Sequence, residues 1–193
     1  MQKNVKKYDV LIIGAGPAGA NAAISYKNLN PDLVVGLVDK SIFPRDKSCG
    51  DAIGPGVISA LKRFKNEHIL EGEPQVVSTT LYGPDNIGIQ NYIPQVKNKE
   101  DSIVYVIPRI DLDNRILNLA KDSGVDVYEG YSFVDFTSNE DKSLRVKVKN
   151  KNEDLEFLTK ILVGADGANS RIRKKLNYNQ NSDWHKAIAI RAY

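Results

Sequence analysis

Residues 8–19 have the sequence YDVLIIGAGPAG, in which an apolar run ends at Ile13 and a glycine-rich segment follows at once. This order is typical of a β-strand that enters a tight turn and continues as a helix with small residues. Gly14 permits the turn, Gly16 has no side chain to block a phosphate, and Gly19 lets the helix lie close to the sheet. The N-terminus of such a helix attracts an anion through its unpaired N–H groups and its dipole. The segment therefore predicts a binding site for a dinucleotide pyrophosphate.

An acidic residue at the expected distance supports this interpretation. A second apolar run, LVVGLV at residues 33–38, ends in Asp39, which lies 20 residues after Gly19. A carboxylate at the end of the second strand is placed to accept hydrogen bonds from the adenosine ribose hydroxyls. The alternative is an ordinary turn residue at a strand end. We favour the nucleotide site because the strand, the glycines and the acid are all in register.

The composition excludes several classes of protein. The chain has 193 residues, of which 41% are hydrophobic and 26% charged, and a net charge of only +3 with its lysines spread out. This balance allows a real core and argues against nucleic acid as a partner. A single cysteine, Cys49, excludes an internal disulfide framework and fits a reducing compartment. No secretory signal, no apolar run of about 20 residues and no metal-ligand spacing is present, so we expect a cytoplasmic protein without a metal.

The hydrophobic pattern predicts an α/β protein. We expect a long loop at 41–56, and long loops in compact domains are often functional. In the expected helix 57–65, the side chains that face the core are Val57, Leu61 and Phe64. In the expected helix 111–123, Asp111 is the N-cap, and the side chains that face the core are Leu112, Ile116 and Leu119. The expected helices are 17–29, 57–65, 111–123 and 170–176, and the expected strands are 8–13, 33–38, 76–82, 87–93, 103–107, 125–129, 132–136, 144–149, 155–159, 160–165 and 187–193.

A second signature follows the run that ends at residue 165. The sequence VGADGANS at residues 163–170 brings Asp166 and Gly167 to the carboxyl end of a strand, where ligands bind in open α/β sheets. Together with the glycine segment, Asp39 and the sequence RIDLD at 109–113, this motif resembles the FAD-dependent enzymes shaped like para-hydroxybenzoate hydroxylase. In that group the Asp-Gly motif lies near both the FAD pyrophosphate and the path of the nicotinamide nucleotide.

Within that group, one stretch points to a narrower family. Residues 43–51, FPRDKSCGD, resemble the PR-x-K-x-CG segment of the geranylgeranyl reductases, and residues 190–193 look like the strand that re-enters their substrate domain. The resemblance covers nearly all of the chain, and FAD is its specific implication. It implies a Rossmann-like FAD-binding domain of the glutathione-reductase type with part of an inserted β-rich substrate domain. The FAD-binding domain would comprise residues 1–72 and 108–182, and the inserted part of the substrate domain residues 73–107. At residues 183–193 the chain would begin its return to the substrate domain.

The resemblance also implies a set of FAD-binding residues. Ala18 would contact FAD through its backbone, and Val134 would lie against the adenine. Cys49 would border the isoalloxazine and is a candidate for a residue near the flavin, but no catalytic residue is assigned. Two positions depart from the family pattern: Asp39 is one methylene shorter than the usual Glu, and Ala52 replaces a further glycine. The complete set is Gly14, Gly16, Pro17, Ala18, Gly19, Asp39, Lys40, Arg45, Cys49, Gly50, Ala52, Arg109, Val134, Asp166 and Gly167.

Each of these residues also has a purely structural interpretation. Asp166 is suited to cap the helix at 170–176, and Arg109 to pair with Asp111 or Asp113. Val134 is of a type most often found in the core, and Cys49 is suited to be a plain loop residue. Arg45 and Lys47 either face a phosphate or are solvated, whereas Trp184 and His185 are assigned no role.

The function implied is a flavin-dependent reductase. We expect NAD(P)H or another donor to reduce FAD, and the flavin to pass hydride to an acceptor such as an isoprenoid C=C bond. Two alternatives stay open: an FAD-dependent monooxygenase or halogenase, and a truncated FAD-binding module without catalysis. A later Gly-Asp motif of the family is missing, so we expect an N-terminal portion or a short form with little activity. A lipid substrate would imply peripheral contact of the cytoplasmic protein with a membrane surface, which stays open because no basic amphipathic helix stands out. The oligomeric state is left open as well.

Overall fold

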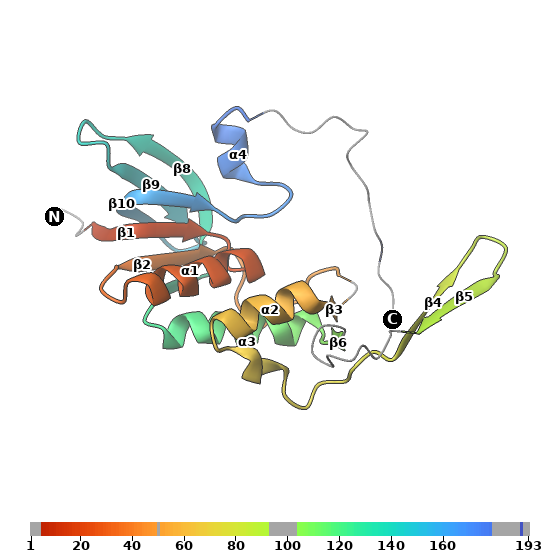
Figure 1. Cartoon of the computed structure of the whole chain (residues 1–193). Helices are drawn as coiled ribbons and strands as arrows, with labels where there is room; N and C mark the ends of the chain where they lie inside the picture. Colours follow the sequence, from red (N-terminus) through yellow and green to blue (C-terminus); the bar gives the residue numbers. More distant parts are fainter. Residues whose placement is uncertain (1–4, 50, 93–103, 179–189, 191–193) are drawn as a thin grey trace. The chain divides into compact units, whose positions relative to one another are not determined.

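The computed structural model describes residues 5–49, 51–92, 104–178 and 190 (Figure 1). These residues form two compact units. The first unit takes its residues from 1–45 and 113–190, and the second from 46–112. The described part of the predicted insert, 73–107, lies within the second unit, and the strand predicted at 187–193 lies outside the described residues except for Ile190.

The first unit is built on a six-stranded sheet in the order β7-β2-β1-β10-β9-β8. Parallel pairing joins β7, β2, β1 and β10, and antiparallel pairing adds β9 and β8. The α/β class and the Rossmann-like parallel core are therefore confirmed. The strands are β1 (Lys6–Ile13), β2 (Val35–Asp39), β7 (Asp126–Glu129), β8 (Ser132–Ser138), β9 (Leu144–Lys149) and β10 (Asp154–Gly164).

The strand β10 corrects one prediction. Two strands were expected, at 155–159 and 160–165, but the structure has one continuous strand from Asp154 to Gly164. It pairs with β9 over residues 154–159 and with β1 over residues 157–164, so both neighbours are paired at residues 157–159. Thr159 and Lys160 interrupt the apolar pattern at the point where the pairing with β9 ends, so the sequence suggested a break.

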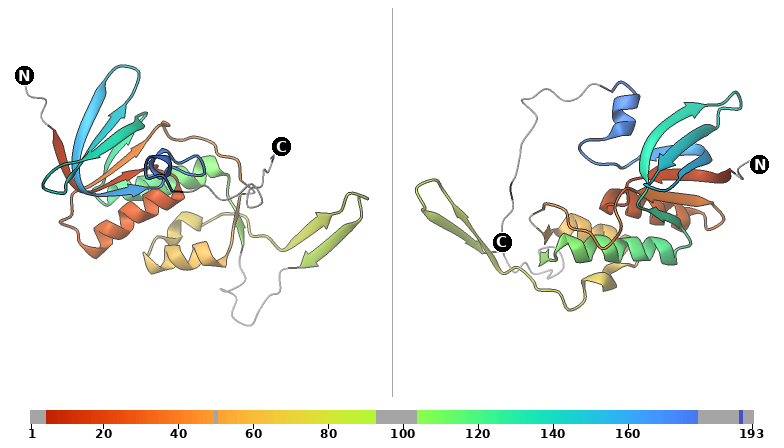
Figure 2. Two further views of the ribbon diagram at one scale, coloured as in Figure 1. Left: turned by 90° about the horizontal axis from the view of Figure 1, so that it is seen from above. Right: turned by 180° about the vertical axis from the view of Figure 1, so that it is seen from behind.

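Two helices of the first unit correspond to the glycine-rich and Asp-Gly motifs. The helix α1 (Pro17–Leu29) lies along one face of the sheet, against β1 and β2 (Figures 1 and 2). Its buried residues are small or β-branched, Gly19, Ala20, Ala23 and Ile24, which lets the helix approach the strands closely. The short helix α4 (Arg171–Lys175) is capped by Ser170, whose hydroxyl accepts from the Arg173 amide at 3.0 Å.

The helix α3 (Arg109–Asp122) begins two residues earlier than predicted. Asp111 is therefore not the N-cap, because its amide and that of Leu112 both donate to the Pro108 carbonyl, at 2.9 and 3.0 Å. Its buried positions are Leu112, Asp113, Ile116, Leu117 and Ala120, whereas the predicted Leu119 is half-buried. The burial of a carboxylate on this face is important for the site described below.

The core of the first unit lies between the sheet and its flanking elements. Tyr8, Leu11, Val146, Val148 and Phe157 are among its most buried members. Each fully buried side chain of this size contributes about 1.5–3 kcal/mol relative to exposure. This core fixes the strands, and with them the positions at which they end.

The second unit contains shorter elements. Its helix α2 (Pro55–Arg63) starts before the predicted residue 57, because proline is well suited to the first helical position. Its buried face is Ile58 and Leu61, whereas the predicted Val57 is exposed. The other elements are β3 (Ala52–Ile53), the 3₁₀ helix η1 (Glu67–Leu70), both unpredicted, and β4 (Ser78–Tyr82), β5 (Gly88–Tyr92) and β6 (Tyr105–Val106). Among the described residues, no helix is long and apolar enough to cross a membrane.

Candidate functional site

The glycine-rich turn lies where three parallel strands end. The amide of Gly14 donates to the Val38 carbonyl at the end of β2, at 2.7 Å. The amide of Ala165, just beyond β10, donates to the Ile13 carbonyl at 2.8 Å. Hydrogen bonds on both sides therefore fix the turn to the carboxyl edge of the sheet, where ligands bind in open α/β folds.

Two glycines of the turn have no room for a side chain. Gly14 has a φ of +104°, and a Cβ there would overlap the carbonyl group of Ala165. A Cβ on Gly19 would overlap the carbonyl oxygen of Gly14. The turn thus requires glycine at both positions for reasons of backbone geometry.

The first turn of α1 presents N–H groups that the helix itself does not use. Gly16 is the N-cap, no side chain caps the helix end, and Pro17 occupies the first helical position. The first intrahelical bond is donated by Ala20 to the Gly16 carbonyl, at 3.0 Å. The amides of Ala18 and Gly19 precede that bond, so they point out of the helix end, where the positive end of the dipole favours an anion.

Arg45 lies beside this helix end. A Cβ on Gly16 would be 3.5 Å from Nη2 of Arg45. The other terminal nitrogen, Nη1, donates to Oδ2 of Asp113 at 2.8 Å, and the Arg45 side chain is only 19% exposed. Arg45 is therefore not a solvated residue, and its guanidinium adds a fixed positive charge to the glycine turn.

Asp39 holds the turn from the side of β2. Its Oδ2 accepts from the Ala15 amide at 2.7 Å, and its Oδ1 accepts from the Ser41 amide at 2.8 Å. Each carboxylate oxygen has a second lone pair, so an acceptor for a ribose hydroxyl is still available. The sequence did not reveal this bracing role, although the short Asp side chain in place of Glu was a signal for it.

Glu129 is a residue that sequence reasoning missed. It is paired with Asp39 in the register of β7 and β2, so two acids lie side by side at the carboxyl edge. Its Oε2 accepts from the Phe43 amide at 2.6 Å, and its Oε1 from Nζ of Lys121 at 2.7 Å. Glu129 thereby anchors the segment that leads from β2 to Arg45.

The carboxylate of Asp166 has two different oxygens. Oδ2 accepts from the Arg171 amide at 2.7 Å, so Asp166 supports the start of α4, which is the structural role considered for it. Oδ1 is buried and has no hydrogen-bond partner among the described residues. Gly167 follows with a φ of +82° and open space around the position of a Cβ. A buried acceptor without a donor fits a site that a ligand completes.

Comparison with known families agrees with this geometry. A family model described as "FAD binding domain" matches residues 7–189. The chain belongs to this FAD-binding domain family. The exposed first turn of α1, the guanidinium beside it and the acids at the ends of β2 and β7 fit a dinucleotide of this kind.

Curated relatives of this FAD-binding domain are longer proteins. The menaquinone reductase of Mycolicibacterium smegmatis is 32% identical over 185 residues, which are 96% of this chain and 44% of the relative. The digeranylgeranylglycerophospholipid reductase of Picrophilus torridus is 27% identical over 165 residues, 84% of this chain and 40% of the relative. The chain thus spans less than half the length of these relatives.

Solved structures share the fold at low sequence identity. The myxobacterial chondrochloren halogenase CndH has a TM-score of 0.72 at 21% identity, over 86% of this chain and 38% of that one. The p-nitrophenol 4-monooxygenase PnpA of Pseudomonas putida has a TM-score of 0.76 at 14% identity, and the match covers 89% of this chain and 44% of PnpA. At these identities the likenesses show a shared fold alone.

The remaining predicted FAD contacts are placed as follows. Val134 is 43% exposed at an irregularity of β8, so it is not a core residue. Lys40 is exposed directly after β2, and Cys49, Ala52 and Arg109 belong to the second unit. Gly50 lies outside the described residues. The contacts of these residues with FAD stay predictions.

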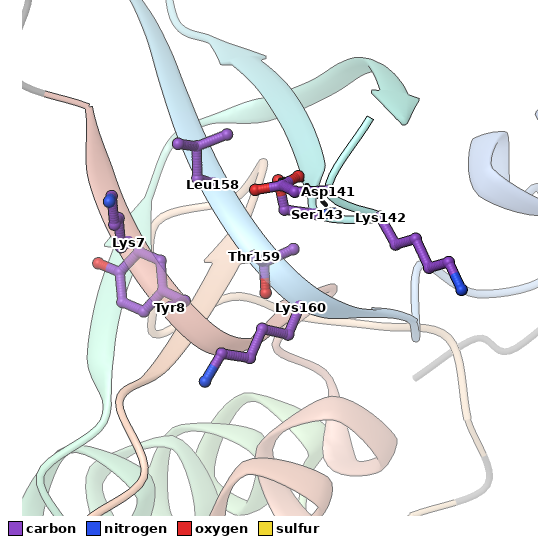
Figure 3. Close-up of a pocket in the computed structure, with 8 residues that line it drawn as sticks. All are labelled: Lys7, Tyr8, Asp141, Lys142, Ser143, Leu158, Thr159 and Lys160. Carbon is purple, nitrogen blue, oxygen red and sulfur yellow. Dashed lines mark hydrogen bonds between the residues drawn. The ribbon is translucent and has the colours of Figure 1, made fainter. Parts of the chain in front are cut away.

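A hollow of about 480 Å³ lies at the amino edge of the sheet, near the start of β1 (Figure 3). It was not predicted. Lys160, on its wall, pairs with Asp9 at 2.8 Å, and Asp141 accepts from the Ser143 amide at 3.0 Å. Its lining residues are Lys7, Tyr8, Asp141, Lys142, Ser143, Leu158, Thr159 and Lys160. Among the described residues, no cluster of side chains could hold a metal ion.

Proposed function

We propose that this chain carries the FAD site of a flavin-dependent reductase that adds hydrogen to a C=C bond of an isoprenoid chain. The observation that carries the cofactor site is the meeting of the open N-terminus of α1 with the Arg45 guanidinium at the end of β1. A diphosphate is the ligand that such an arrangement favours, because both groups attract negative charge.

The residues of the first unit have separate tasks in this proposal. The amides of Ala18 and Gly19, with Arg45, bind the pyrophosphate; Asp39 accepts from the adenosine ribose; and Oδ1 of Asp166 accepts from a hydroxyl or amide of the cofactor. When bound, FAD supplies the two-electron redox chemistry. The chain's own contribution is binding and orientation.

The names of the relatives support an isoprenoid substrate. A digeranylgeranylglycerophospholipid reductase and a geranylgeranyl diphosphate reductase, the latter from Rhodobacter capsulatus, are both among the similar proteins. Geranylgeranyl groups are isoprenoid chains with several C=C bonds, and menaquinone carries an isoprenoid tail as well. The segment at residues 43–51, with its PR-x-K-x-CG pattern, supports the same substrate class. NAD(P)H is the electron donor that we propose.

A monooxygenase or halogenase is the second candidate. It is favoured by the structural likeness to CndH and PnpA, whose TM-scores of 0.72 and 0.76 exceed the 0.69 of a geranylgeranyl bacteriochlorophyll reductase-like protein from Thermoplasma acidophilum. Such an enzyme uses the same flavin site but passes electrons to oxygen.

An anaerobic reoxidation experiment separates the two candidates. The chain is loaded with FAD, reduced by light under nitrogen, and mixed with geranylgeranyl diphosphate. A reductase restores the oxidised flavin band without oxygen and gives a product with two more hydrogens per reduced bond. Reoxidation only after air is admitted, with a hydroxylated or halogenated product, would favour the second candidate. A chain that retains FAD but does neither would be a binding module.

A further inference from the structure

Asp113 is a buried carboxylate to which the predicted FAD site assigns no role. It lies in the first half of α3, and its side chain is 0% exposed. A carboxylate removed from water in this way is costly unless a positive or hydrogen-bonding partner compensates it. A polar residue of that kind on the inner face of a helix therefore has a specific task.

Its ion pair is formed with Arg45 over a long distance in sequence. The two residues are 68 positions apart, and Nη1 of Arg45 donates to Oδ2 of Asp113 at 2.8 Å. On one face of the guanidinium lies the ring of Phe43, whose centroid is 4.8 Å from Cζ. The carboxylate and the ring together restrict both the position and the plane of the guanidinium.

This restriction leaves one nitrogen directed to the glycine turn. Nη1 is used by Asp113, whereas Nη2 lies beside Gly16, 3.5 Å from where a Cβ would be. The positive end of the α1 dipole is at the same place. A guanidinium brought close to a positive helix end is an unfavourable arrangement until an anion lies between them, so something must hold the side chain there.

We infer that Asp113 is a positioning residue, which holds Arg45 so that Nη2 is directed at the diphosphate of the bound dinucleotide. This inference rests on the proposed FAD site. When the charge of Asp113 is removed, the inference and simple charge balance predict changes of opposite sign in the affinity for a diphosphate. If Asp113 were only a counter-ion, removing its charge would leave Arg45 more positive and tighten the binding of a diphosphate. If it positions Arg45, removal weakens that binding.

Four variants of the full chain test this: Asp113→Asn, Arg45→Gln, the double variant, and Asp126→Asn as control. Asp126 pairs with Lys6 at 2.9 Å near the amino end of β7, away from the turn. The dissociation constants of FAD and ADP are measured by titration, adenosine serves as a ligand without phosphate, and thermal unfolding without ligand monitors the fold. We expect Asp113→Asn to weaken FAD and ADP about tenfold and adenosine not at all, since a charge-assisted hydrogen bond to the diphosphate is lost.

The double variant shows whether Asp113 acts through Arg45. On the inference, adding Asp113→Asn to Arg45→Gln changes the FAD affinity no further, because the two changes remove one interaction. Asp126→Asn leaves the affinity unchanged. This comparison also serves if Asp113→Asn alone does not fold, since both charges of the pair are absent from the double variant.

The results that overturn the inference are distinct from failure of the proposed function. Unchanged or tighter FAD binding by Asp113→Asn, or a further loss in the double variant, would overturn the positioning role while the FAD site stands. A wild-type chain that binds neither FAD nor ADP would overturn the proposed site and the inference with it.

Discussion

The two edges of the six-stranded sheet differ in how their polar groups are held. At the carboxyl edge, β1, β2, β7 and α3 bring Asp39, Arg45, Asp113 and Glu129 together around the glycine turn. At the amino edge, a hollow of about 480 Å³ is lined by several lysines. At the first edge, hydrogen bonds and a buried ion pair hold the polar groups, whereas at the second edge the ion pair on the wall of the hollow is formed by a largely exposed lysine.

The close-up of the hollow makes the difference plain. Lys7, Lys142 and Lys160 extend in different directions and do not converge on one point (Figure 3). Lys160 is 77% exposed and already paired with Asp9. At the glycine turn, by contrast, the guanidinium is constrained by a buried carboxylate and an aromatic ring. The carboxyl edge therefore fits the proposed nucleotide site better than the hollow does.

The largest expected effect comes from a side chain placed in the turn. Gly14→Ala should lower the free energy of unfolding by about 3–5 kcal/mol and abolish FAD binding, because its Cβ would overlap Ala165 and its φ is positive. Gly56→Ala, where a Cβ meets nothing within 4 Å, is the matched control and should be neutral or slightly stabilising. Urea unfolding and FAD titration measure both. A stable, FAD-binding Gly14→Ala variant would contradict the account of this edge.

A smaller effect is expected where a side chain braces the turn. Asp39→Asn leaves one of the Ala15 and Ser41 amides facing an NH₂ group instead of an oxygen. We expect a loss of about 1–3 kcal/mol of unfolding free energy and weaker FAD binding. Asp32→Asn, in the exposed turn before β2, is the control for removing an acid. If the two variants are equally stable and bind FAD equally, Asp39 does not brace the turn.

The amino edge should contribute less, and in a pH-dependent way. A hydrogen bond from Lys160, with a second from the Val34 amide, lowers the pKa of Asp9 below its ordinary value. Because the folded pKa is the lower one, Asp9 stabilises the fold above about pH 4, and the gain disappears as the pH falls through the folded value.

The test compares the wild type with Asp9→Asn by urea unfolding at neutral and at acidic pH. The wild type should be more stable by less than about 1 kcal/mol at neutral pH, since an exposed partner limits the pair, and the difference should vanish in acid. FAD affinity at neutral pH should be the same in both. A stability difference that grows in acid would mean that folding raises the pKa of Asp9 instead of lowering it.

The smallest effect is expected from Lys7 and Lys142, on the wall of the hollow. Lys7→Ala combined with Lys142→Ala should leave the dissociation constant of FAD unchanged, because both residues line the hollow near the start of β1, whereas the glycine turn follows the end of that strand (Figure 3). Titration at low ionic strength is the most sensitive measurement, since screening by salt is then weakest. A tenfold loss would move the proposed dinucleotide site to the amino edge.

The same contrast explains what the sequence could predict. The strand, turn and helix at residues 8–29 were predictable because the positive φ of Gly14 and the contact of Gly19 with the Gly14 carbonyl are local features of the backbone, whereas the close approach of Gly14 to Ala165 is not local. The start of α2 was placed late because Pro55 and Gly56 indicate a loop in most contexts, whereas proline is favoured at a first helical position. The continuity of β10 depends on its pairing with two neighbouring strands, which overlap at residues 157–159, so no local pattern reveals it.

The supporting residues of the candidate site were predictable only in part. Asp39, Arg45, Asp113 and Asp166 belong to recognisable motifs, but the pairing of Arg45 with Asp113 does not follow from those motifs. Asp113 and Glu129 act on residues 68 and 86 positions away in the chain, and nothing in the sequence around them signals those contacts. The motif residues could therefore be named from sequence, and the contacts that hold them could not.

The most direct measurement is a titration of the purified chain with FAD, followed by competition with ADP and with riboflavin. The account predicts that FAD binds, that ADP displaces it, and that riboflavin does not, because the described carboxyl edge binds the diphosphate and adenosine half of the cofactor. Displacement by riboflavin but not by ADP, or no binding of FAD at all, would contradict the assignment of the glycine turn as the pyrophosphate site.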